Sequence, residues 1–147
     1  MSTFDVNAFQ NATFTESNST TYTPVPEGEY PAAIREADDI KIRATEKGSV
    51  ILDIKWTIDD ASVTAVTGFE TNTVRQSIFL DVTANGGLDF AKGKNIQLGR
   101  LREAVKQNQA GQPWTFGSLV GAVARVTVKH RLVDDQIYTD VRGVAAL

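Results

Sequence analysis

The sequence lacks cysteine altogether and has a single histidine, His130, among its 147 residues. Without cysteine the chain has no disulfide, no thiolate metal site and no cysteine nucleophile. One histidine excludes a histidine-rich zinc site and leaves one candidate base for a serine triad. We therefore expect no metal, no cofactor and no enzymatic activity.

Long apolar runs are missing as well. No stretch approaches the ~20 apolar residues that span a bilayer, and the opening MSTFDVNAFQ has neither the basic region nor the apolar core of a signal peptide. We expect neither membrane insertion nor secretion. With 41% hydrophobic and 22% charged residues, the composition is that of an ordinary globular domain. The length corresponds to about one such domain.

The charges are unevenly distributed, although the net charge is only −3. Residues 1–40 hold seven acidic residues and one basic residue, whereas residues 92–147 hold nine basic and four acidic residues. An acidic protein of this kind is not coated in positive charge. A local basic surface is nevertheless enough to attract a polyanion.

Residues 1–26 are predicted to form a flexible polar arm. Twelve of them are serine, threonine or asparagine, and such a segment cannot bury enough apolar surface to fold alone. Its aromatic side chains could contact its own domain or a neighbouring subunit, and they are Phe4, Phe9, Phe14 and Tyr22. The ordered domain is expected to occupy residues 27–147.

Most of this domain has the alternating pattern of β-strands. The pattern is clearest where apolar and polar side chains alternate in SVILDIKWTI and VRQSIFLDVT. Strands are predicted over residues 30–37, 49–58, 74–83, 122–131 and 137–144. One helix is predicted over residues 95–110, because Leu98, Leu101 and Val105 recur at helical spacing, with Asn95 as N-cap and Gly111 just after the C-terminus.

This order of three strands, a helix and two strands is the order of the OB-fold, a five-stranded barrel with a helix between strands three and four. A five-stranded antiparallel sheet with one apolar face must close or be covered. A split sandwich or another half-open barrel is the alternative. Trp56 is expected in the core, and Trp114 and Phe116 at the bottom of the barrel. We thus predict a mainly β, OB-fold-like domain.

Successive side chains of a strand point to opposite faces. If the apolar face of each strand points inward, parity therefore identifies the residues that point outward, which are those between the apolar ones. They combine cations with two aromatic rings, and the loop between the first two strands adds three cations. Single-stranded nucleic acid is bound by this combination, because cations follow the phosphates and rings stack on bases at roughly 1–3 kcal/mol each. The candidate DNA-binding residues are Arg35, Lys41, Arg43, Lys47, Lys55, Arg75, Phe79, Arg125, Lys129, Arg131, Tyr138 and Arg142.

Each of these signals has a plainer interpretation. Lysine and arginine on strands face solvent in any barrel, and an outward Phe79 needs a partner that could be a base, the arm or a second subunit. The aspartate pairs at 38–39, 59–60 and 134–135 could indicate a two-metal nuclease. They fall at expected turns, however, where aspartate is favoured for local hydrogen bonds.

Several segments carry a family resemblance over about residues 24–147. They are PVPEGEYPAAIREAD, GSVILDIKWTIDD, KGKNIQLGRLREAVKQN, LVGAVARVTVKHR and YTDVRGVAAL. In these segments the chain resembles small phage-encoded single-stranded DNA-binding proteins. The resemblance implies an OB-fold that coats single-stranded DNA during phage replication or recombination, in the cytoplasm of the bacterial host, without enzymatic activity. It also implies phage replication or recombination proteins as further partners.

The sequence therefore predicts a non-enzymatic, sequence-tolerant single-stranded DNA-binding protein that can form homo-oligomers. The alternative is a virion or assembly protein that uses the N-terminal arm for subunit contacts. An enzyme, such as a nuclease built on the turn aspartates, is the third hypothesis.

Overall fold

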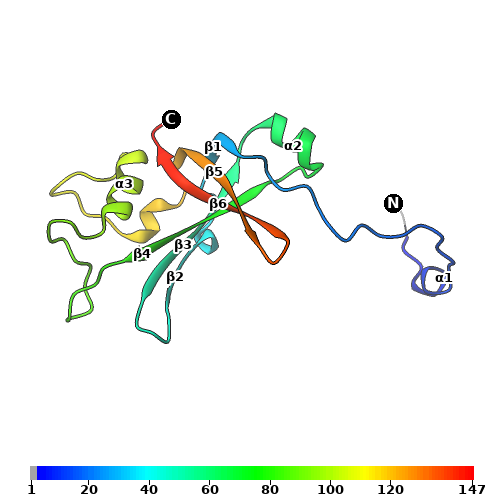
Figure 1. The fold of residues 1–147 in the computed structure, drawn as a ribbon, viewed down its shortest axis with the longest axis horizontal. Coiled ribbons are helices and arrows are strands. Elements are labelled where there is room, and N and C mark those ends of the chain that lie inside the picture. Colours follow the sequence, from blue (N-terminus) through cyan, green and yellow to red (C-terminus); the bar gives the residue numbers. More distant parts are fainter. Residues whose placement is uncertain (1–2) are drawn as a thin grey trace.

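A computed structural model describes residues 3–147 and is mainly β (Figure 1). None of the helices in these residues has the length and apolar content of a membrane span. The elements, in chain order, are α1 (Val6–Gln10), β1 (Gly28–Ala33), the short 3₁₀ helix η1 (Ala37–Asp39), β2 (Ile40–Ala44), β3 (Val50–Ile58), α2 (Ala61–Thr67), β4 (Thr73–Leu80), α3 (Ile96–Ala104), the 3₁₀ helix η2 (Phe116–Leu119), β5 (Val123–Val133) and β6 (Gln136–Ala145).

Five of the six described strands form a closed ring. The order around it is β1, β5, β6, β4 and β3, and β3 pairs back with β1 where Ile58 lies opposite Ala32. The pairs are antiparallel except β4–β6, which is parallel and joined at one register position, Arg75 beside Asp140. β2 is not part of the ring and pairs with β3.

The core lies inside this ring because alternate side chains of each strand point inward. Trp56 on β3 is fully buried, as predicted, and β5 contributes Ala124, Val126 and Val128. Helix α3 adds its buried apolar face to the same core. Trp114 and Phe116 pack partly buried against it, with ring centroids 4.9 Å apart.

All five predicted strands are confirmed, with ends that agree to within four residues. The sixth, β2, was predicted to be a loop. It is short and alternates Ile40 and Ile42 with cations, a composition typical of an edge strand. Helices α1 and α2 were not predicted either. α2 consists of ASVTAVT, which is poor in strong helix formers, and it depends on the Asp60 N-cap and on Gly68 at its end.

Helix α3 begins after Asn95, as predicted, but it ends at Ala104 rather than near residue 110. Lys106 adopts a left-handed conformation with φ of 62° and turns the chain away. The tertiary contacts of the next segment favour this early end, because the Trp114 indole donates to Gln107 at 2.8 Å and the Arg102 guanidinium lies 4.2 Å from the Trp114 ring. The predicted role of Gly111 at the helix end is therefore wrong.

The segment that precedes β1 leaves the ring and extends away from it (Figure 1). Residues 3–23 are exposed throughout. Phe9 in α1 contacts Phe4 and Phe14, with ring centroids 5.1 and 5.7 Å apart. That this arm is flexible, and that it is separate from residues 27–147, stays a prediction.

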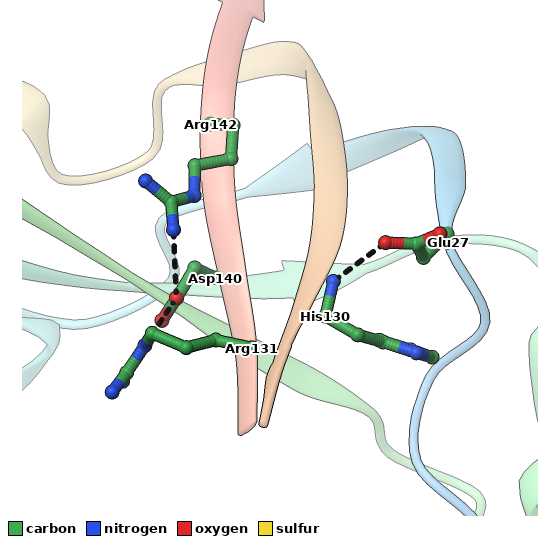
Figure 2. A network of polar contacts seen from close by, with 5 residues as sticks. All are labelled: Glu27, His130, Arg131, Asp140 and Arg142. Carbon is green, nitrogen blue, oxygen red and sulfur yellow. Dashed lines mark hydrogen bonds and ion pairs between the residues drawn. The ribbon is translucent and has the colours of Figure 1, made fainter. Parts of the chain in front are cut away.

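Between the arm and β1, the chain contacts β5 through Val25 and Glu27, and Figure 2 shows the contact of Glu27. The backbone N–H of His130 donates to the Glu27 carboxylate at 2.8 Å, and the His130 ring Nε2 lies 2.7 Å from the carbonyl oxygen of Val25. The hydrogen bond from the His130 backbone lowers the pKa of the Glu27 carboxyl. These contacts determine where the chain enters β1, and they occupy the single histidine in a structural role.

The early end of α3 can be tested at Lys106. A non-glycine residue in the left-handed region costs about 1–2 kcal/mol, and the greater freedom of glycine in the unfolded chain offsets part of that gain. We expect Lys106→Gly to raise the free energy of unfolding by up to about 1 kcal/mol in denaturant titrations. Glu103→Gly, inside the helix, should lower it by about 1 kcal/mol. Equal destabilisation by both variants would mean that the helix continues past residue 106.

Candidate nucleic-acid interface

The outer face of β3 and β4 carries three of the predicted residues, and the register of the two strands places them. Lys55 lies directly opposite Arg75, and Ile51 lies opposite Phe79. Phe79 is 64% exposed, so its predicted outward orientation is confirmed. Like charges directly opposite each other are destabilising, so the Lys55–Arg75 pair favours a bound anion.

β2 extends this face beyond β3. Lys41 lies opposite Asp53, and Arg43 lies opposite Ile51. Asp53 accepts from Arg43 Nε at 2.6 Å and from Ser77 Oγ at 2.6 Å. Partial burial raises the pKa of the Asp53 carboxyl, but the hydrogen bonds from Arg43 and Ser77 and the charges of Arg43 and Arg75 outweigh it, so the pKa lies below its ordinary value of 3.8.

The β5–β6 hairpin carries a second group of cations around Asp140 (Figure 2). Asp140 accepts from Arg131 Nε at 2.8 Å and lies 3.6 Å from Arg142, while Lys129 is its partner on β5. The Arg131 guanidinium lies 5.1 Å from the centre of the Tyr138 ring, which is 42% exposed. Arg131, Asp140 and Arg142 lie on one side of the hairpin, and Glu27 and His130 lie on the other.

The two groups meet where Arg75 on β4 pairs with Asp140 on β6. Neighbours in a sheet point to the same side, so one outer face continues across five strands, from β2 through β3, β4 and β6 to β5. We call this face the cationic strip. Its members are the cations Lys41, Arg43, Lys55, Arg75, Lys129, Arg131 and Arg142, the rings Phe79 and Tyr138, and the acids Asp39, Asp53 and Asp140. Seven cations against three carboxylates leave the strip positive.

The structure does not bring the other three predicted residues into the strip. Arg125 is on the outer face of β5 as well, but it lies four residues before Lys129 and its neighbours are Pro31 on β1 and Ala145 on β6 rather than the residues of the strip. Arg35 follows the end of β1, and Lys47 is in the turn between β2 and β3. Nine of the twelve predicted residues therefore share one surface.

Strand parity puts Asp53 on the outward face with Lys55, and Asp140 on that face with Tyr138 and Arg142, but the ion pairs of these acids were not predicted, and Asp39 lies outside the strands. Asp39 lies 3.5 Å from the Lys55 amine, and together with Asp53 and Asp140 it pairs with four of the seven cations. Arg100 on α3 was also missed. It faces β6 across a groove that Gln76 lines as well. In the sequence, the one sign of this groove was Gln76, a polar residue on the otherwise apolar side of β4.

Two of the three aspartate pairs make local hydrogen bonds, as expected of turns. Asp39 accepts from the backbone N–H of Glu36, and Asp60 accepts from that of Ser62 at the start of α2. Asp134 and Asp135 both have positive φ in the β5–β6 turn. In the part of the chain that the structure describes, no group of three or more metal-ligating side chains lies together.

Comparison with known proteins adds no family to this description. The chain matches no family model, and no curated protein matches its sequence significantly. The resemblance to phage single-stranded DNA-binding proteins stays a prediction, and the functional inference depends on the geometry of the strip.

The Arg43–Asp53–Ser77 contact can be tested by its pH dependence. Because the pKa of Asp53 is lowered in the folded protein, its stabilising effect is present above the ordinary value and is lost as the pH falls through the folded-state pKa. We expect wild type to exceed Asp53→Asn in free energy of unfolding at about pH 7, and this difference to shrink towards about pH 3.

Glu46→Gln is the matched control, because Glu46 is exposed in the turn between β2 and β3 and has no ion pair within residues 3–147. The free energy of unfolding of Glu46→Gln should differ little from that of wild type at both pH values. An Asp53→Asn difference that stayed constant with pH would contradict the assigned pKa direction.

Proposed function

We propose that this chain is a non-enzymatic, sequence-tolerant single-stranded DNA-binding protein. The observation that carries the proposal is the cationic strip, a continuous positive face with an exposed aromatic ring in each of its two halves. Cations in a row follow a phosphate backbone, and exposed rings provide stacking surfaces for unpaired bases. A duplex has its bases already stacked, so rings of this kind favour the single strand.

We further propose that the ring is an OB-fold. In support, β1 and β2 are separated only by residues 34–39, which include the short η1. They pair with opposite ends of β3, as the two halves of one bent first strand would. β3, β4, β5 and β6 then correspond to strands two to five, with α3 between the third and the fourth. OB-folds bind oligonucleotides on the face of strands two and three and on the adjoining loops, and this face coincides with the β3–β4 part of the strip.

In the proposed mechanism, cations neutralise the phosphates and aromatic rings stack on the bases. Arg75, Lys129 and Lys41 have no ion pair within residues 3–147 and are ready to neutralise phosphates. Phe79 and Tyr138 would accept bases on their faces, and this stacking is tolerant of sequence because every base has a flat face. The resemblance over residues 24–147 extends the proposal to phage DNA replication or recombination in the host cytoplasm, with the phage proteins of those processes as partners.

A second candidate function is a virion or assembly protein, and one observation favours it. Phe4, Phe9 and Phe14 form an exposed aromatic cluster on an arm that extends away from the ring. Exposed apolar clusters of this kind mark contacts between proteins, and exchange of arms between protomers is a common route to oligomers. A mass that is a fixed multiple of 16.0 kDa, with no affinity for DNA, would favour this candidate.

The proposal predicts a specific loss of binding at Arg75. Fluorescence anisotropy with labelled oligo-dT should show tight, salt-sensitive binding, with a duplex of equal length bound much more weakly. Arg75→Ala should weaken binding and reduce the slope of log affinity against log salt by about 0.7, the amount for one phosphate on a single strand.

Arg125→Ala is the matched control, since it removes the same charge from an outward position outside the strip. It should leave the slope nearly unchanged. Absence of wild-type binding to oligo-dT at low salt would overturn the proposed function, and equal effects of both variants would show that the strip is not the site.

Phe79 provides a separate test of stacking. We expect Phe79→Ala to weaken oligo-dT binding by about 1–3 kcal/mol, or roughly 5-fold to 150-fold, with an unchanged salt slope because no charge is lost. Phe90→Ala is the control, because Phe90 is an exposed phenylalanine outside the strip. If the two variants bound alike, Phe79 would not contact bases.

A further inference from the structure

The parallel pair β4–β6 leaves an opening in the ring. The two strands share one register position, Arg75 beside Asp140. Past this position, residues 76–78 of β4 and residues 141–144 of β6 line a groove of about 280 Å³ together with α3. Three elements therefore meet at this groove, and it adjoins the cationic strip because Arg142 belongs to both.

The floor of the groove holds a side-chain amide whose orientation is determined by a buried tryptophan. The Trp56 indole N–H donates to Gln76 Oε1 at 2.9 Å. An indole N–H can only donate, so the amide oxygen of Gln76 must face Trp56 and its NH₂ group must face the other way. Within residues 3–147 no hydrogen bond to that NH₂ is found, so Gln76 retains two unused donors beside the groove.

The rim of the groove is cationic. Arg100 projects from α3 on one side, and Arg142 belongs to β6 on the other. None of the lining residues is acidic. Arg142 is 59% exposed, and its ion pair with Asp140 is long at 3.6 Å, so most of its donors are unused.

A groove with donors at its floor and two guanidinium groups at its rim selects for an anion rich in acceptor oxygens. Phosphate has this chemistry, because guanidinium groups pair with its oxygens in a bidentate manner. A metal cation is disfavoured by the two positive charges, and a carboxylate would offer fewer acceptors to the same donors.

We propose that Gln76, Arg100 and Arg142 form a phosphate-binding groove which, on the basis of the proposed function, carries the backbone of bound single-stranded DNA from the cationic strip towards α3. The polynucleotide then crosses the junction of β4 and β6 and continues over the opening in the ring. Arg100 is outside the strip, so a contribution of Arg100 to DNA binding would distinguish this path from binding on the strip alone.

The two tryptophans of the chain provide a reporter and an internal control. The Trp56 indole N–H is bonded to Gln76, whereas the Trp114 indole N–H is bonded to Gln107 in a different part of the fold. In ¹H–¹⁵N NMR spectra of the full chain, inorganic phosphate and oligo-dT, in separate titrations, should each shift the Trp56 indole resonance and leave that of Trp114 in place.

Two variants localise the effect. Arg100→Ala should abolish the shift caused by phosphate and lower the oligo-dT salt slope by about 0.7. Gln76→Glu keeps an oxygen acceptor for Trp56 but replaces the NH₂ donors with a negative charge, so it should also abolish the shift. Arg125→Ala and Gln112→Glu make the same charge changes at residues that do not line the groove, and they should behave as wild type. The unliganded Trp56 resonance shows whether each variant is folded.

The possible results separate this inference from the proposed function. Oligo-dT binding without a Trp56 shift, or with a shift and salt slope that Arg100→Ala leaves unchanged, would overturn the groove and retain the DNA-binding function. A Trp56 shift with phosphate, together with no binding of oligo-dT, would retain an anion site but overturn the polynucleotide path and the proposed function. No response to either probe would overturn both.

Discussion

Arg75 on β4 lies beside Asp140 on β6, and the ring of strands closes between β4 and β6 at this position. The pairing aligns the outer face of β2, β3 and β4 with that of the β5–β6 hairpin, so cations from distant parts of the sequence share one surface. Past the pair the strands separate, and α3 with Arg100 lies over the opening. The strip and the groove are thus both consequences of how the ring closes.

The strip is stable in the absence of a ligand because it contains its own acids. Lys55 and Arg75 lie directly opposite each other, an arrangement that is unfavourable for two cations. Asp39 beside Lys55 and Asp140 beside Arg75 reduce that repulsion. Asp140 also orients the Arg131 and Arg142 guanidinium groups within the strip.

Strand parity predicted most of this surface, because a period of two determines which side chains leave the core. It placed Phe79 and the cations of β3 and β4 correctly outward. It could not predict that Asp140 pairs with Arg131 and Arg142, since that contact depends on hairpin register. Nor could it find β2, which is short and charged, or the early end of α3, which depends on contacts of Trp114. Tertiary contacts, absent from any local pattern, decided these features.

The ion pairs within the strip would also affect the number of ions released on DNA binding and the enthalpy of binding. Under the proposed function, a phosphate that took Arg43 from Asp53, or Arg131 from Asp140, would deprive that carboxylate of its nearest cation. That carboxylate would then attract a cation from solution, and this uptake would partly offset the cations that the proposed binding releases from the DNA. The number of ions displaced on association would be smaller than the seven cations of the strip imply, and the enthalpy of exchanging one ion pair for another would contribute more to the affinity.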